Sequence, residues 1–200
     1  MYDKDSEQFD PMASLRVIRE TIDVARRDLS DDGFHFLLWG ALLSVAGLCH
    51  YWLSDVARVW WSPLIWIAPV ALGIPAAFAY EYGRKKRKSA YNIIRRWYGM
   101  VWLGFLVTLL ALIFWSQWHG VSPTPLILAI TGFAVFVSGQ LLRFQPLGYG
   151  SALIWAGSLV CIWTTGAQDS LVFSAVIAIG YLIPGLLLRK QSRRGYVSGA

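Results

Sequence analysis

The sequence Arg84-Lys85-Lys86-Arg87-Lys88 decides how this chain is organised. These five consecutive cations lie between two long apolar runs, residues 60–82 and 97–118. Lysine and arginine residues that flank membrane-spanning segments remain on the cytoplasmic side of a bilayer. The stretch therefore predicts that both neighbouring runs have their cytoplasmic ends at this point.

The composition indicates a membrane protein. The 200 residues are 56% hydrophobic and only 15% charged, whereas soluble domains average about 25% charged residues. Long apolar runs match the length that a hydrocarbon core of about 30 Å requires. We therefore predict an all-α, polytopic membrane protein with six transmembrane helices. The runs cover residues 34–52, 60–82, 97–118, 124–144, 147–165 and 170–188.

The distribution of cations predicts the orientation. With a cytoplasmic N-terminus, 17 of the 18 Lys and Arg residues lie in cytoplasmic segments, and Arg58 alone lies outside. The reverse orientation would place 17 cations on the wrong side, so we expect both termini in the cytoplasm of a bacterial cell and the chain in its inner membrane. This bias also accounts for the net charge of +6, and no nucleic-acid partner is expected.

The first 33 residues are expected to be a cytoplasmic segment with an amphipathic helix over residues 11–29. Leu15, Ile18 and Ile22 recur at spacings of three and four and form one apolar stripe. Two interpretations stay open: a helix lying on the inner membrane surface, or a docking helix for another protein or a second copy. Residues 34–188 then form the transmembrane domain, and residues 189–200 form a basic cytoplasmic tail.

A weak internal repeat favours three antiparallel helical hairpins. Two pairs of glycines seven positions apart, each followed in the next run by a proline, recur at an offset of about 110 residues. The alternative is convergence, because membrane helices reuse the same small residues. The repeated positions are Gly40 with Gly47 and Pro75, and Gly150 with Gly157 and Pro184.

Small residues four positions apart predict close approaches between helices, either within the chain or in self-association with a partner subunit. The arginine and lysine residues from Arg84 to Lys88 and the stripe of Leu15, Ile18 and Ile22 are the predicted surface for a protein partner or lipid. The small-residue pairs are Gly40 with Ser44, Gly73 with Ala77, Ala152 with Ala156, Gly157 with Cys161, and Ser174 with Ala178.

No ionisable residue lies near the middle of any run, which argues against proton-coupled transport and intramembrane hydrolysis. His50 and Asp169 belong to the outer boundary. The two cysteines, Cys49 and Cys161, have neither metal-ligand nor disulfide spacing. We therefore expect no enzyme activity, catalytic residue, cofactor or metal.

Four deeper residues are candidates for a small-molecule pocket, because aromatic walls with a few polar groups suit an uncharged ring compound. The alternative for the same residues is ordinary packing. The candidates are Trp66, Trp102, Gln140 and Trp155.

The segment Ala25-Arg-Arg-Asp-Leu-Ser-Asp-Asp-Gly-Phe-His-Phe-Leu-Leu-Trp-Gly-Ala41 resembles the opening of a group of small bacterial integral membrane proteins. These proteins share a helix, a short polar break and an aromatic-Leu-Leu-Trp-Gly start to the first span. The group has no established activity, so the resemblance implies no functional residue. The size and the six spans also resemble the substrate-binding subunits of energy-coupling-factor vitamin importers. That resemblance implies a transport partner met through small residues of the first span, either Ala41 and Val45 or Gly40 and Ser44.

Two functional hypotheses follow. The first is a non-enzymatic integral membrane protein that acts as a partner-binding or regulatory component through its cytoplasmic helix and basic loop. The second is a substrate-binding subunit of a transporter for a small, vitamin-like molecule. An outward-opening cavity near Trp66 and Trp155 would favour the second hypothesis, and a solid bundle would favour the first.

Overall fold

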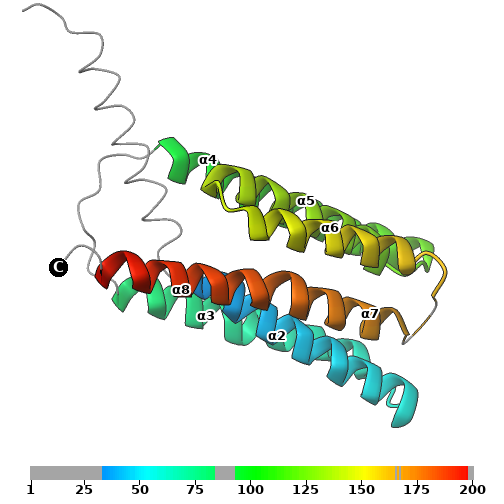
Figure 1. Ribbon diagram of the computed structural model, residues 1–200. Helices are drawn as coiled ribbons and strands as arrows, with labels where there is room; N and C mark the ends of the chain where they lie inside the picture. The colour runs from blue at the N-terminus through cyan, green and yellow to red at the C-terminus, as the bar shows by residue number, and fades with distance from the viewer. Residues whose placement is uncertain (1–32, 84–92, 165, 167, 198–200) are drawn as a thin grey trace, which may run out of the picture.

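The computed structural model describes residues 33–83, 93–164, 166 and 168–197, and every regular element within these ranges is helical. The helices run along one common direction, so the chain passes back and forth between two ends (Figure 1). The Lys190 end is where α2 and α4 begin and α8 finishes, and the Asp169 end is where α7 begins. In chain order the elements are α2 Phe34–Tyr51, the π-helical turn η1 Trp52–Val56, the 3₁₀ helix η2 Ser62–Trp66, α3 Ile67–Gly83, α4 Ile93–His119, α5 Thr124–Leu142, α6 Gln145–Val160, α7 Gln168–Ile177, the π-helical turn η3 Ala178–Leu182 and α8 Ile183–Val197.

Five helical segments are long and apolar enough to cross a membrane. The sixth predicted run corresponds to α6, whose 16 residues extend about 24 Å, less than the hydrocarbon thickness of about 30 Å. The prediction of an all-helical fold is confirmed for the described residues, and the length and composition of these helices are consistent with a multi-pass membrane protein. The spanning segments are Phe34–Val56, Ser62–Tyr82, Arg96–His119, Thr124–Leu142 and Gln168–Gln191.

The last helical segment, formed by α7, η3 and α8, occupies the centre of the molecule. It packs against α2 on one side and α6 on another, and Phe173, Ile177 and Tyr181 from it are almost completely buried. Its neighbours continue outward in order, because α3 packs on α2, α5 packs on α6, and α4 packs on α5. The hydrophobic core therefore forms around the C-terminal segment.

Glycines let α2 and α6 approach this central segment closely. A Cβ atom at Gly40 would lie 2.7 Å from Tyr181 Cβ, and one at Gly150 would lie 2.6 Å from the carbonyl oxygen of Gly180. Gly47 and Gly157 meet Ser174 and Val176 in the same way. In a bilayer the hydrophobic effect contributes little to helix association, because lipid tails are as apolar as the side chains. Close packing at small residues drives association instead. Both glycine pairs of the sequence repeat therefore pack on one shared helix.

The outermost helices α3 and α4 are the least buried of the spanning segments. Phe78 of α3 and Leu103 and Phe114 of α4 expose more than half of their surface. Apolar surface of this extent is excluded from water in soluble proteins, whereas a membrane helix presents it to lipid. The side of the bundle is therefore suited to contact with acyl chains.

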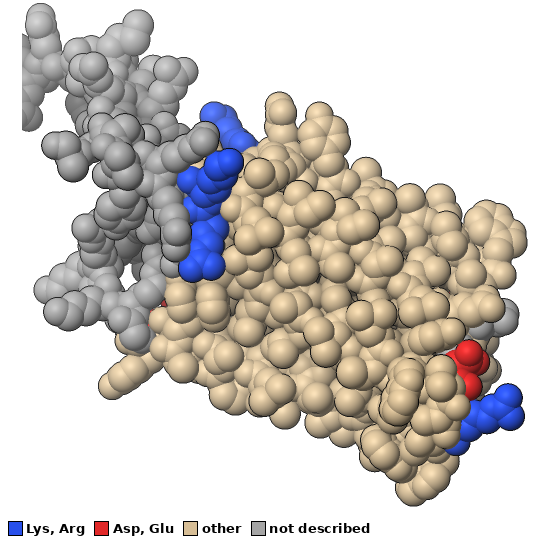
Figure 2. All heavy atoms as spheres, turned by 60° about the horizontal axis from the view of Figure 1, so that its bottom comes forward, with Lys and Arg blue, Asp and Glu red and all other residues tan. Residues whose placement is uncertain are grey.

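Charged side chains occupy the two ends of the molecule. On the face shown in Figure 2, the Lys, Arg, Asp and Glu side chains are confined to the two ends of the molecule. The broad surface between the ends carries other residue types. Among the described side chains, Arg96, Arg143, Arg189 and Lys190 belong to the Lys190 end, and Arg58 belongs to the Asp169 end. This division gives the uncharged belt that a bilayer requires.

Candidate functional site

Asp169 is the centre of a hydrogen-bond network at the end that bears its name. It lies in the first turn of α7 and is 2% exposed. Its carboxylate accepts hydrogen bonds from Ser122 Oγ at 2.8 Å and Thr164 Oγ1 at 2.6 Å. The Cys161 thiol lies 3.9 Å from the Asp169 carbonyl oxygen, as a weak donor. An isolated buried carboxylate is costly, and these hydroxyl donors offset that cost.

The network joins two connections to the start of the central segment. Ser122 lies between α4 and α5, Thr164 lies between α6 and α7, and Asp169 begins the central segment. Ser158 of α6 adds a 2.8 Å hydrogen bond to the carbonyl oxygen of Pro125 at the start of α5. The cluster therefore ties the outer group of helices α4, α5 and α6 to α7.

His50 and Ser170 form a second polar contact beside this network. His50 Nδ1 and Ser170 Oγ lie 2.8 Å apart and join α2 to α7, and Ser174 Oγ donates to the Ser170 carbonyl at 2.7 Å. A serine bonded to a histidine is the first requirement for a nucleophile and its base. Ser170 is only 5% exposed, however, so the geometry is that of a tether between two helices and offers no space for a substrate.

Three of the four residues predicted to line a pocket lie apart from one another, each among different neighbours. Trp66 packs edge-on against Phe173 and beside His50, with ring centroids 5.2 and 5.8 Å away. Gln140 is exposed on α5. Trp155 of α6 lies over Gly132 and donates from Nε1 to the Ala129 carbonyl at 3.0 Å.

The fourth, Trp102 of α4, is half-buried and makes a tilted ring contact with Tyr98 and an edge-on contact with Phe105 of its own helix. These four residues thus come from η2, α4, α5 and α6, and each has its own neighbours. The structure does not gather them around the groove described below.

The predicted partner surface of Leu15, Ile18, Ile22 and Arg84 to Lys88 lies outside the described residues. The point where the first of these segments joins the bundle is described. Gly33, with φ +57°, is buried against Gly185 and Leu188 of α8. The chain before Gly33 is therefore attached at the Lys190 end, next to α8.

The predicted small-residue pairs divide between internal and exposed positions. Gly40, Ser44, Gly157 and Cys161 are buried against other helices of the same chain. Ala152 and Ala156 of α6 are exposed instead. Two of the five pairs are therefore used within the chain, and the alanine pair remains available to a neighbour.

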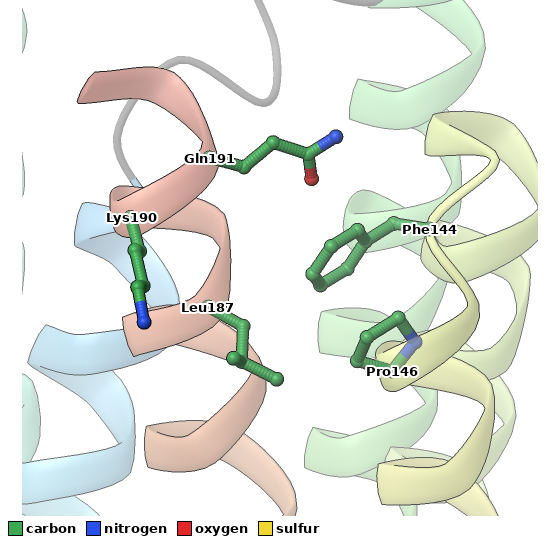
Figure 3. A pocket seen from close by; sticks show the side chains of 5 residues that line it. All are labelled: Phe144, Pro146, Leu187, Lys190 and Gln191. Atoms are coloured by element: carbon green, nitrogen blue, oxygen red, sulfur yellow. The ribbon is translucent and has the colours of Figure 1, made fainter. Parts of the chain in front are cut away.

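A groove at the Lys190 end lies between α8 and the turn that joins α5 to α6. Its volume is about 320 Å³, and its lining combines apolar and polar side chains. Figure 3 shows Gln191 and Leu187 of α8 facing Phe144 and Pro146, with Lys190 on the side of α8 turned away from these two residues and its side chain running along the helix. No sequence pattern pointed to this groove, because its two walls are more than 40 positions apart. The lining residues are Phe144, Pro146, Leu187, Lys190 and Gln191.

In the described part of the chain, no three His, Cys, Asp or Glu residues lie close enough together to hold a metal ion. Comparison with known proteins found no matching family model, no matching curated protein and no matching solved structure. The functional argument therefore depends on the geometry of the bundle.

Proposed function

We propose that this chain is a non-enzymatic integral membrane protein of a bacterial inner membrane that binds a protein partner or regulates it. It crosses the bilayer six times as three antiparallel hairpins. The observation that carries the proposal is the combination of an apolar side surface, charged ends and a core of buried hydrophobic residues. Such a bundle is a platform that presents its ends to other molecules.

The Lys190 end faces the cytoplasm in this proposal. Arg96, Arg143, Arg189 and Lys190 belong to it, and the cluster from Arg84 to Lys88 joins α3 to α4 at the same end. Segments with this many Lys and Arg residues remain on the cytoplasmic side. Both termini then lie in the cytoplasm.

The sixth crossing is made by α6. Its 16 helical residues are followed by hydrogen-bonded turns in which Ile162 N bonds Leu159 O and Trp163 N bonds Val160 O. These turns lengthen the segment toward the Asp169 end. Trp163 is 80% exposed there, as suits a tryptophan at a membrane interface.

The partner-binding element is the amphipathic helix of residues 11–29. Its apolar stripe of Leu15, Ile18 and Ile22 is exposed to water unless a partner or lipid covers it. The burial of Gly33 against α8 supports this role, because it fixes the attachment point of the segment beside the basic end. A partner bound to a helix attached at this point lies next to the membrane domain.

The transporter alternative receives less support. Trp66 and Trp155, which would line an outward-facing cavity, instead fill space against Phe173 and Gly132. An enzyme is also disfavoured, because Ser170, the serine that contacts His50, is buried. Both observations favour a solid bundle.

Site-specific crosslinking in membranes tests the partner role. We would replace Leu15, Ile18 and Ile22 with serine in the full chain and compare crosslinked protein adducts with those of the wild type. The matched control replaces Arg16, Glu20 and Asp23, which lie on the other faces of the same predicted helix. Loss of a discrete adduct in the first variant alone supports docking, whereas equal adducts in all three proteins contradict it.

A further inference from the structure

We propose that the groove at the Lys190 end binds one phospholipid with a negatively charged headgroup. The inference is independent of the partner-binding role, because it needs only that the bundle lies in a bilayer. It starts from the chemical character of the groove, which changes from apolar to cationic along α8.

The apolar part of the site is a lane on α8. Ile183, Leu187 and Gln191 are spaced four residues apart, and Lys190 lies one turn beyond Leu187. Residues at these spacings share one face of an α-helix. Ile183 is 51% exposed and Leu187 is 42% exposed, so an acyl chain can lie along them without displacing any core residue.

The opposite wall is also apolar. Phe144 directly precedes α6 and Pro146 lies in its first turn, and both face Leu187 across the groove (Figure 3). Pro146 has no backbone N–H group that would need a partner. The two walls thus enclose an apolar strip that continues the lipid-facing surface of the bundle.

The polar part of the site is suited to a phosphate group. Lys190, at the edge of the groove, carries the positive charge on a flexible side chain, Gln191 adds an amide that can donate hydrogen bonds, and both are exposed. Within the described residues, Lys190 makes no ion pair, and the one acid at this end, Glu81, is bonded to His35. Arg143 and Arg189 increase the local positive charge. Basic pockets between membrane helices bind anionic headgroups for this reason.

Charge therefore selects among candidate occupants. A zwitterionic lipid has the same acyl chains but gains no net attraction from Lys190, and an uncharged molecule uses only the apolar walls. The groove is continuous with lipid-facing surface, so the occupant reaches it from the bilayer. An anionic phospholipid satisfies the apolar and the cationic parts together.

Native mass spectrometry of the full chain with added phosphatidylglycerol or phosphatidylcholine tests this site. We expect phosphatidylglycerol adducts to survive activation that removes phosphatidylcholine. Lys190→Gln should weaken phosphatidylglycerol binding about five-fold, the contribution of one cation near a membrane surface. Leu187→Trp should fill the groove and remove the tight adduct of either lipid.

Two control variants match these changes. Arg96→Gln removes an exposed cation of the same end from α4, and Leu186→Trp enlarges an exposed neighbour that does not line the groove. Both should keep wild-type lipid binding. Equal loss in the control and groove variants would show general charge or folding effects and overturn the proposal.

Two further outcomes would also overturn it. Glycerol phosphate that displaces phosphatidylglycerol completely would identify an anion site without a role for the acyl chain. Efficient disulfide formation between Ile18→Cys and Leu187→Cys in the full chain would show that the chain's own N-terminal segment occupies the groove.

Discussion

The Ser122 hydroxyl donates a 2.8 Å hydrogen bond to the carboxylate of Asp169, although 47 positions separate the two residues. Ser122 lies in the connection between α4 and α5, and Asp169 begins the central helical segment. One hydrogen bond thus links the connection between α4 and α5 to the most buried spanning segment. The predictions below begin from this contact.

Replacing Asp169 with alanine should lower the free energy of unfolding by about 2–3 kcal/mol. The change removes the acceptor of the Ser122 and Thr164 hydroxyls, whose hydrogen bonds to the buried Asp169 are part-buried, and hydrogen bonds to charged groups contribute about 1.5–3 kcal/mol. Denaturant unfolding in detergent micelles measures the loss. Asp55→Ala, at an exposed carboxylate of the same end, is the control. Equal stability of the two variants would mean that the Asp169 network contributes nothing.

Replacing Gly150 with alanine should destabilise the bundle by about 1–3 kcal/mol, the usual cost of overpacking. The new Cβ would lie 2.6 Å from the Gly180 carbonyl oxygen, which belongs to backbone and cannot rotate away. Gly148→Ala in the same helix is the control, because a Cβ there meets no atom within 4 Å. That control should be neutral or stabilising by up to about 1 kcal/mol, since alanine favours helix. If Gly150→Ala melts like Gly148→Ala, α6 does not pack on the central segment as described.

Removal of the positive charges from Arg84 to Lys88, by substitution with glutamine, should produce a fraction of misinserted molecules. The change takes away five of the seven cations between the second and third predicted spans, and loop cations direct insertion. Protease protection of the C-terminal tail in membrane vesicles measures the fraction. Fully native topology would show that the remaining cytoplasmic cations are sufficient and that this cluster is redundant.

Much of the architecture could be predicted from the sequence, because bilayer thickness sets run length. The predicted run 34–52 corresponds to α2 with its π-helical turn, and the run 97–118 lies inside α4. Residues 145–146, between the fourth and fifth predicted runs, are the start of α6, which lies beside α5. These boundaries follow from local hydropathy and proline positions.

The position of each helix in the bundle could not be predicted. Lipid and protein core are both apolar, so a buried helix and an exposed one have the same composition. The repeat of Gly40 with Gly47 and of Gly150 with Gly157 was visible, and the structure shows that both pairs meet α7 and η3. Their shared contact depends on three-dimensional proximity that spacing does not encode.

The burial of Asp169 was also missed. From the sequence it belonged to the outer boundary, where a carboxylate is expected to face water. Its location at that end agrees with the structure, but its side chain is 2% exposed. The available signal was the polar sequence Thr164 to Ser170, whose hydroxyls and carboxylate fall around one helix start. Its partner Ser122 could be found only from the fold.

The most direct test of the account is the sidedness of α6, because this short helix decides between five and six crossings. With Cys49 and Cys161 replaced by alanine, single cysteines would be placed at Gln145 and Gly166, at its opposite ends. A membrane-impermeant maleimide applied to intact cells should label Gly166→Cys and leave Gln145→Cys unlabelled until the membrane is opened. Labelling of both positions from outside, or of neither, would contradict a six-span protein with its cationic end in the cytoplasm.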